Sequence, residues 1–203
     1  MLLDTFKHKG MRKQMIDKLK EGGISNEEVL RVMSEVPRHW FLETALLDFA
    51  YGNMPFPNRA FLGVLPSMEV AKILSLLDIQ AFQKVLEVGI GTGYNSVLMS
   101  KLKAKVFALE GDRTNFTNAG LLFQQLDKKI KLFYKSDFQN GLEEHAPYDQ
   151  IIVMQPLSEE PEKLRDQLAI DGKLLFRCKV EKGVKLVLVI RTTENRFVTS
   201  ELL

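Results

Sequence analysis

The sequence predicts an α/β fold with a mostly parallel seven-stranded sheet, helices on both of its faces and an N-terminal helical segment. Short apolar segments alternate with amphipathic ones from residue 84 onward, a pattern typical of a parallel sheet covered on both sides. A glycine-rich turn joins the first of these strands to the helix after it. The last two predicted strands have no helix between them, so we expect them to form a hairpin at one edge of the sheet.

The N-terminal segment, residues 1–78, reads as helices and loops that pack on the core of residues 79–203 within one compact domain. Apolar side chains recur at helical spacing from Met11 to Lys20. Ser25 is the expected N-cap of a second helix, with Glu28 completing a capping box. Glycine and proline residues make Tyr51–Pro66 a predicted loop, and Met68–Leu77 is the predicted third helix.

The core is expected to alternate strands with helices. The predicted helices are Tyr94–Leu102, Asn115–Leu126 and Pro161–Leu168. The predicted strands are Lys84–Val88, Lys105–Leu109, Lys131–Tyr134, Gln150–Met154, Lys173–Cys178, Lys185–Arg191 and Arg196–Thr199.

Size and charge narrow the class of protein. The 203 residues, 45% of them hydrophobic, suit a single globular domain. A net charge of +2 does not indicate a nucleic-acid partner, and the basic run Lys7–Lys20 is interpreted as a solvated helix face. The sequence lacks a signal peptide and any apolar run long enough to span a bilayer. We therefore expect a cytoplasmic protein with no membrane partner.

The residue types that most often bind metals are sparse. Cys178 is the only cysteine, which excludes an internal disulfide and a thiolate cluster, and we expect it to be a buried structural thiol. His8, His39 and His145 share no ligand spacing with one another or with that cysteine. The sequence therefore predicts no metal site.

The glycine-rich turn predicts the cofactor. The segment 84–94, KVLEVGIGTGY, is a strand, an acidic residue and three glycines at alternate positions before a helix begins. A dinucleotide fingerprint would place its third glycine one residue later, where Tyr94 stands. The observed spacing suits S-adenosylmethionine, which has no pyrophosphate to seat on the helix, and so favours a class I methyltransferase with a Rossmann-like fold. The predicted cofactor residues here are Glu87, Gly89, Gly91, Thr92 and Gly93.

Two further strand ends carry acidic residues where open α/β sheets bind ligands. Glu110 ends the second core strand, and its carboxylate can accept both hydroxyls of a ribose; it could also be a solvated end-of-strand acid, and NAD would use the same pairing. Asp137 and Phe138 follow the third strand, where the acid can accept from the adenine amine while the neighbouring ring or backbone lines the base. An ordinary turn or cap is the alternative for Asp137.

Beyond these residues, the chain resembles protein-L-isoaspartate O-methyltransferases over nearly its whole length. The segment 36–41, VPRHWF, is similar to that family's Val-Pro-Arg-His-x-Phe. The cofactor segment 85–94 and the segment APYDQIIV at 146–153 also correspond to family motifs. Methyltransferases in general share the glycine turn but not the N-terminal segment, so the resemblance is specific.

The resemblance implies an enzyme that transfers the methyl group of S-adenosylmethionine to the α-carboxylate of L-isoaspartyl and some D-aspartyl residues, with a damaged protein or peptide as its substrate. Because a carboxylate is already ionised at neutral pH, this transfer needs no general base. Catalysis would then rest on alignment of the reactants and exclusion of water. The absence of an obvious catalytic histidine or lysine therefore does not argue against activity.

The acceptor side departs from the family pattern. Where the family has Thr-Ile-Ser-x-Pro, this chain reads LGVLP at 62–66, which puts Leu62 and Val64 in the places of the two hydroxyl residues. A missing hydrogen bond to a charged acceptor costs roughly 1–3 kcal/mol. Ser67 could supply a hydroxyl from a shifted position or cap the helix, so the loop candidates for the transfer site are Val64, Pro66 and Ser67.

Two more departures lie on the same side. Met154–Ser158 replaces the family's small residues, and the chain stops at Leu203 where family members continue. An alternative function is therefore a family member that binds S-adenosylmethionine but methylates another acceptor, or is weak or inactive. A nicotinamide-dependent oxidoreductase is opposed by the glycine spacing and by the N-terminal segment.

Overall fold

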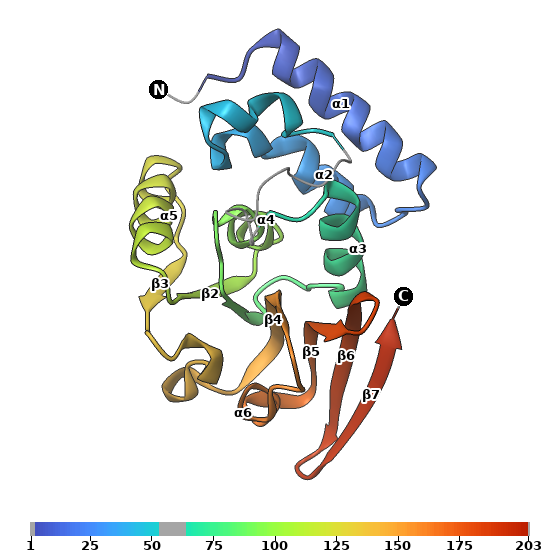
Figure 1. The fold of residues 1–203 in the computed structure, drawn as a ribbon, viewed down its shortest axis with the longest axis vertical. Coiled ribbons are helices and arrows are strands. Elements are labelled where there is room, and N and C mark those ends of the chain that lie inside the picture. The colour runs from blue at the N-terminus through green and yellow to red at the C-terminus, as the bar shows by residue number, and fades with distance from the viewer. Residues whose placement is uncertain (1–2, 53–63, 203) are drawn as a thin grey trace.

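A computed structural model of the chain describes residues 3–52 and 64–202 and contains one seven-stranded sheet in the order β3-β2-β1-β4-β5-β6-β7 (Figure 1). Strands β3, β2, β1, β4 and β5 run parallel, whereas β6 pairs antiparallel with both β5 and β7. The expected hairpin at the sheet edge is therefore present. The strands are β1 Lys84–Val88, β2 Lys105–Glu110, β3 Lys131–Tyr134, β4 Tyr148–Leu157, β5 Leu168–Val180, β6 Gly183–Thr193 and β7 Arg196–Leu202.

In Figure 1, α1 and α2 lie at the top of the molecule, and α3 lies below them, near β5. The α-helices are α1 Phe6–Glu21, α2 Glu27–Glu35, α3 Ser67–Leu77, α4 Tyr94–Lys101, α5 Arg113–Gln125 and α6 Glu162–Arg165. Short 3-10 helices are η1 Arg38–Phe41, η2 Thr44–Phe49, η4 Phe138–Asn140 and η5 Glu143–His145.

Two apolar clusters form the core, one on each face of the sheet. The larger cluster joins side chains of α1 to α5 to β-strand residues such as Val85, Val106 and Leu175. The smaller cluster lies on the opposite face, where Leu86, Phe107 and residues near η4, η5 and α6 pack together. Because side chains alternate along a strand, successive residues of β1 enter different clusters. The N-terminal segment and the sheet thus share one continuous core.

The α/β class and the strand order agree with the sequence prediction, but several boundaries differ. The helix expected over Pro161–Leu168 is only the single turn α6, because Leu168 already pairs in β5. The N-cap of α2 is Asn26 rather than Ser25, since the Asn26 side chain accepts the hydrogen bond from the Val29 amide. The sequence did not predict η1 and η2. Most of the loop predicted between residues 51 and 66 lies outside the described residues.

Two of the three histidines meet in the N-terminal segment, although their spacing predicted no shared site. The rings of His8 and His39 lie 3.9 Å apart between centroids, and Asp4 is near both. Asp4, however, pairs with Arg12 at 2.8 Å, and Nδ1 of His39 lies 2.7 Å from the Tyr51 hydroxyl. These polar atoms already have partners within the protein, so the group reads as a structural network that ties α1 to η1.

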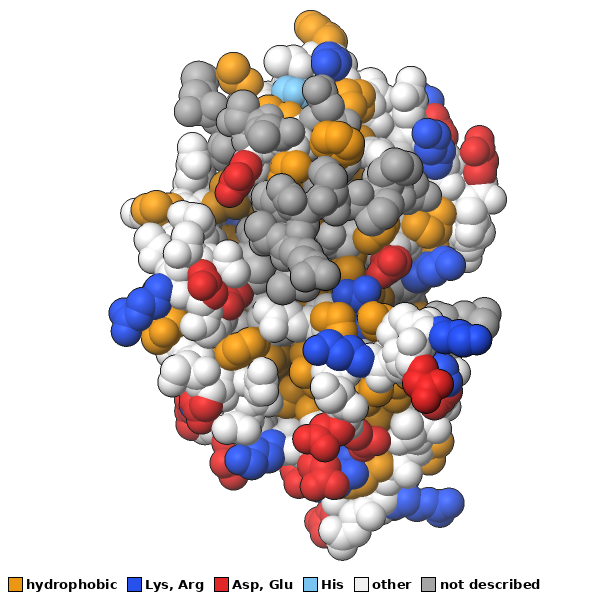
Figure 2. All heavy atoms as spheres, in the orientation of Figure 1, with side chains coloured by type: hydrophobic (Ala, Val, Ile, Leu, Met, Phe, Trp, Pro, Cys, Tyr) orange, Lys and Arg blue, Asp and Glu red, His pale blue; other side chains and the backbone are white. Residues whose placement is uncertain are grey.

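The surface shows no large region of one charge on the face in Figure 2, where described acidic and basic side chains are interspersed. Within residues 3–52 and 64–202, every helix is too short or too polar to cross a membrane. Cys178 is half-buried against the smaller apolar cluster, less enclosed than the sequence predicted, because it lies near the exposed end of β5.

Candidate functional site

The glycine turn between β1 and α4 has a backbone that other residues rarely adopt. Gly89, Gly91 and Gly93 have φ angles of +74°, +55° and +78°. At Gly93 there is also no room for a side chain, because a Cβ atom would lie 2.8 Å from the Phe123 ring of α5. β1 pairs with β2 on one side and β4 on the other, so this turn opens where the strand order reverses. Open α/β sheets bind their ligands at this position.

Glu87 lies beneath the turn with no solvent exposure. One carboxylate oxygen accepts a hydrogen bond from the Ser96 hydroxyl of α4, and the other, Oε1, has no hydrogen-bond partner among the described residues. Burial raises the pKa of Glu87 from 4.5 to about 7, against the opposing effect of Ser96. Among the described residues, Glu87 therefore has a buried acceptor atom, Oε1, that is without a hydrogen-bond partner near the end of β1.

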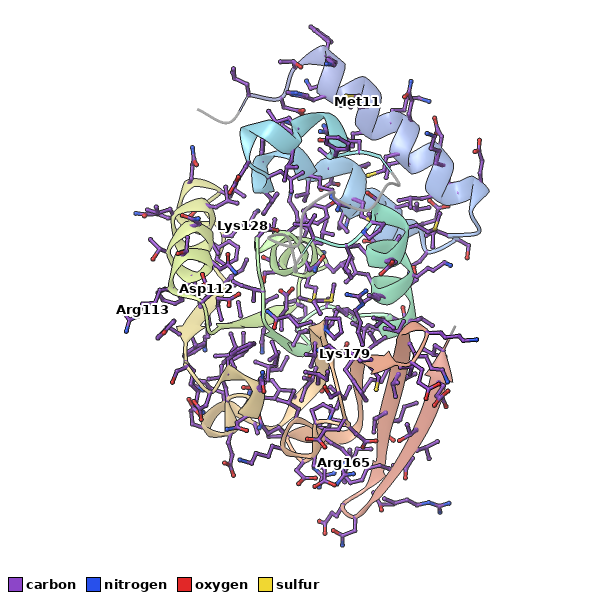
Figure 3. The ribbon with its side chains drawn as sticks, in the orientation of Figure 1. Met11, Asp112, Arg113, Lys128, Arg165 and Lys179 are labelled. Carbon is purple, nitrogen blue, oxygen red and sulfur yellow. The ribbon has the colours of Figure 1, made fainter. Side chains whose placement is uncertain are left out.

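Glu110, at the end of β2, connects the glycine turn to the start of α5. Its Oε2 accepts from the Gly91 amide at 2.9 Å, and its Oε1 accepts from the amides of Gly111 and Asp112 at 2.8 and 2.9 Å. The side chain is only 1% exposed. Because a carboxylate offers about four acceptor positions, three backbone contacts leave about one for a ribose hydroxyl. Figure 3 labels Asp112 and Arg113 at this helix start.

Asp137 and Phe138 lie beyond the end of β3, but in different environments. Asp137 is exposed; the Asn140 side chain donates to it at 3.2 Å and lowers the pKa of Asp137. The Phe138 ring turns inward: a Cβ placed on Gly111 would overlap it, and one placed on Gly89 would lie 3.3 Å from its Cε2 atom. The ring therefore lies across the ends of β1 and β2.

The start of α3 carries the predicted loop candidates. Val64 and Pro66 are half-buried, whereas Ser67 is buried and its hydroxyl accepts from Arg38 Nη1 at 2.6 Å. As placed, that hydroxyl faces the protein interior instead of a substrate. Pro66 is the N-cap of α3, so Ser67 does not cap the helix. Leu62 lies outside the described residues.

Arg38 is a residue of this region to which the sequence assigned no role. Its Nη2 donates to the Leu65 carbonyl, and its guanidinium carbon lies 5.4 Å from the centre of the Tyr94 ring. Arg38 thereby links η1, the start of α3 and the start of α4. The signal was available in the Val-Pro-Arg-His segment, but a motif does not reveal which groups its arginine contacts.

A cavity of about 700 Å³ lies beside the ends of β1 and β4. Phe138 forms part of its wall, and Lys179 lines it near the centre of Figure 3, whereas Arg165 lies on α6 below. Acidic side chains gather around it. The charged lining residues are Glu159, Glu160, Glu162, Lys163 and Lys179.

Comparison with known proteins decides the family. Residues 10–202 match the family model described as protein-L-isoaspartate(D-aspartate) O-methyltransferase. This chain belongs to that family. The resemblance seen in the sequence is confirmed.

Individual family members agree along nearly the whole chain. The protein-L-isoaspartate O-methyltransferase of Flavobacterium psychrophilum is 35% identical over 194 residues, covering 96% of this chain and 91% of that protein. The one from Christiangramia forsetii is 33% identical, with coverage of 98% and 92%.

Solved structures share the fold. A protein-L-isoaspartate O-methyltransferase superposes with a TM-score of 0.81 at 24% identity, covering 95% of this chain and 63% of that one. A putative family member from Plasmodium falciparum, in complex with S-adenosyl-L-homocysteine, gives 0.78 at 21% identity and covers 94% of each chain. The Rossmann-like methyltransferase fold predicted from the sequence is confirmed.

Proposed function

We propose that this protein is an S-adenosylmethionine-dependent O-methyltransferase that acts on the carboxylate of L-isoaspartyl or D-aspartyl residues in damaged proteins. The observation that carries this proposal is the glycine turn at the switch point of the sheet, with Glu87 and Glu110 on either side of it. Membership of the family over residues 10–202 supports the same activity.

The residues around the glycine turn fit this cofactor in the crevice beyond the ends of β1 and β2. The unpartnered Oε1 of Glu87 suits a group with N–H donors, and the three glycines leave backbone free of side chains. When bound, S-adenosylmethionine supplies a methyl group on a positively charged sulfur. The residues proposed to hold it are Glu87, Gly89, Gly91, Thr92, Gly93, Glu110 and Asp137. Phe138 lies beside them, at the end of the site proposed for the adenine.

The chain's own task in the reaction is placement rather than proton transfer. An aspartyl carboxylate is ionised at neutral pH, so no side chain has to remove a proton from it. Val64 and Pro66 are half-buried apolar side chains at the start of α3 and suit a water-poor boundary for the acceptor. Arg38 fixes this boundary through Ser67 and the Leu65 carbonyl.

A weak or altered acceptor activity is the alternative that the loop sequence raises, since Val64 cannot offer the hydroxyl of the family's serine. The relatives' shared name favours the isoaspartyl acceptor. We also propose that the protein acts in the cytoplasm, without a nucleic-acid or membrane partner, because damaged cellular proteins are its expected substrates.

A methyl-transfer assay tests the function. The purified protein is incubated with radiolabelled S-adenosylmethionine and an isoaspartyl peptide, beside the same peptide with a normal aspartyl residue. We expect label on the isoaspartyl peptide alone. Label on neither peptide, with S-adenosylhomocysteine binding demonstrated by calorimetry, would support the alternative acceptor or an inactive protein.

A further inference from the structure

The Phe138 side chain points inward from η4, across the ends of β2 and β1. Its ring lies where a side chain on Gly111, after β2, would have to be, and its far edge lies 3.3 Å from the position of a Cβ atom on Gly89, after β1. Gln155, from β4, approaches Gly89 from the same side, with its side-chain carbon 3.3 Å from where a Cβ would stand. The ring therefore spans the crevice from β2 to β1.

Under the proposed function, on which this inference rests, that position belongs to the adenine base. The ribose is expected at Glu110 and the adenine amine at Asp137, so the base has to lie between the ends of β2 and β3. Gly111 is the residue directly after Glu110, and Phe138 is the residue directly after Asp137. A ring in contact with Gly111 fills the gap between those two acids.

The backbone that carries the ring is anchored on both sides. The Gln167 side chain donates to the Asn140 carbonyl at 2.7 Å and accepts from the Leu142 amide at 3.0 Å. Before the ring, the Lys135 amide donates to the Glu110 carbonyl at 3.1 Å. Because these hydrogen bonds hold the backbone of η4 in place, the ring can leave this position by rotation of the Phe138 side chain.

Space for that rotation exists next to the ring. Phe138 also lines the cavity of about 700 Å³ beside the ends of β1 and β4. Val88 and Val153 contribute an apolar part of the same wall. A phenyl ring turned into this cavity would keep apolar contacts while leaving Gly111 exposed to the crevice.

We propose that Phe138 gates the adenine end of the cofactor crevice. In the conformation of this structure the ring fills the place proposed for the base, and the cofactor binds only when the ring has turned toward the cavity. The contacts that the ring gives up at Gly89 and Gly111 oppose cofactor binding. Phe138 is thus a residue that sets affinity for the adenosine half of the cofactor.

The test is calorimetric titration of the wild type and of Phe138→Ala with S-adenosylhomocysteine and, separately, with adenosine. We expect both ligands to bind at least about tenfold more tightly to the variant, a factor that corresponds to about 1.4 kcal/mol. Phe197→Ala is the matched control, since Phe197 is also a half-buried ring packed on the smaller apolar cluster but lies on β7. The control should bind like the wild type.

The other outcomes distinguish an error in the role proposed for Phe138 from an error in the proposed methyltransferase function. Equal or weaker binding by Phe138→Ala would overturn the gate, since the ring would then be neutral or a lining residue, while the proposed function would stand. Failure of both proteins to bind S-adenosylhomocysteine would overturn the cofactor assignment together with the gate. If the alanine variant does not fold, Phe138→Leu serves instead, because it removes the ring but keeps an apolar side chain; it too should bind more tightly than the wild type.

Discussion

Glu87 combines complete burial with a hydrogen bond to only one of its two oxygens, which makes the protein's stability depend on pH. Its pKa is about 7 in the folded protein against 4.5 ordinarily, so the unfolded chain releases this proton first as the pH rises. The stability associated with protonated Glu87 is therefore fully present below pH 4.5 and is lost as the pH approaches 7. A displacement of this size corresponds to roughly 3 kcal/mol.

We predict that Glu87→Gln removes this decline. We would measure the free energy of unfolding in urea at pH 5, 6, 7 and 8. The wild type should lose stability over this range relative to the variant, because glutamine at position 87 does not titrate. Glu28→Gln is the control, because Arg31 lowers the pKa of Glu28 and its removal should leave the decline in place. If the free energy of unfolding changed with pH in the same way for the wild type and Glu87→Gln, the raised pKa of Glu87 would be contradicted.

Glu110 is expected to affect both binding and stability. In Glu110→Ala, the amides of Gly91, Gly111 and Asp112 lose their common acceptor. A buried donor without a partner costs about 1–3 kcal/mol; because these amides are only partly buried, we expect a total loss of roughly 1–3 kcal/mol in urea unfolding. Binding of S-adenosylhomocysteine, measured by calorimetry, should also weaken strongly. An unchanged affinity would remove Glu110 from the cofactor site.

At this scale, sequence reasoning located the residues better than it described their contacts. Glu87 and Glu110 could be placed at strand ends because topology alone brings the carboxyl ends of parallel strands together. The backbone amides that occupy Glu110 depend on loop conformation, which the residue pattern does not encode. The sequence left open whether the ring or the backbone of Phe138 faces inward, for the same reason: a side chain next to Asp137 can point either way.

Among the elements, the start of α3 is the one proposed to border the methyl acceptor. We predict that Val64→Ser raises methyl transfer to an isoaspartyl peptide, because it restores the hydroxyl that the family carries in this loop. One added hydrogen bond to a charged group is worth roughly 1–3 kcal/mol, so the gain should be about fivefold or more. Val64→Ala, which shortens the side chain without a hydroxyl, is the control in the radiolabel assay. An equal gain in both variants would assign the effect to space rather than to hydrogen bonding.

Two strands have the bounds that the residue pattern predicted, whether strongly buried, as β1 is, or only half-buried, as β3 is. β1 and β3 have the predicted bounds, since each is a short run enclosed by turn residues. β4 and β5 extend beyond their apolar centres, because strand pairing continues through Pro156 and Lys179, whose side chains give no apolar signal. α6 was overestimated because its residues share helical propensity with the segment that β5 takes over.

For the whole molecule, ligand binding should appear as added thermal stability. At about 100 times its Kd, a ligand that binds only the folded state adds about 2.7 kcal/mol. For a chain of 203 residues this corresponds to a rise in Tm of roughly 5–10 °C. We predict such a rise with S-adenosylhomocysteine and none with NAD, in a thermal-shift assay at matched concentrations. A larger rise in Tm with NAD than with S-adenosylhomocysteine would contradict the prediction, from the glycine spacing, of an S-adenosylmethionine site.

The division of the chain into an N-terminal segment, residues 1–78, and a core, residues 79–203, stays a prediction. The larger apolar cluster crosses this boundary. Leu19 and Met33 from the N-terminal segment share that cluster with Val85 and Leu175 of the sheet. Such an arrangement could be anticipated only in outline from the sequence, because the helical pattern of residues 1–78 shows an apolar stripe without showing what covers it.

The contact between Gly93 and Phe123 has a consequence for how this protein can evolve. The turn that begins α4 and the Phe123 ring of α5 occupy adjoining space, so a side chain at position 93 fits only if that ring shifts or a smaller residue replaces it. The two positions are therefore epistatic: an accepted change at one depends on the residue already present at the other. The φ of +78° at Gly93 adds backbone strain to any such change, so selection should keep glycine there even in lineages with a smaller residue at position 123.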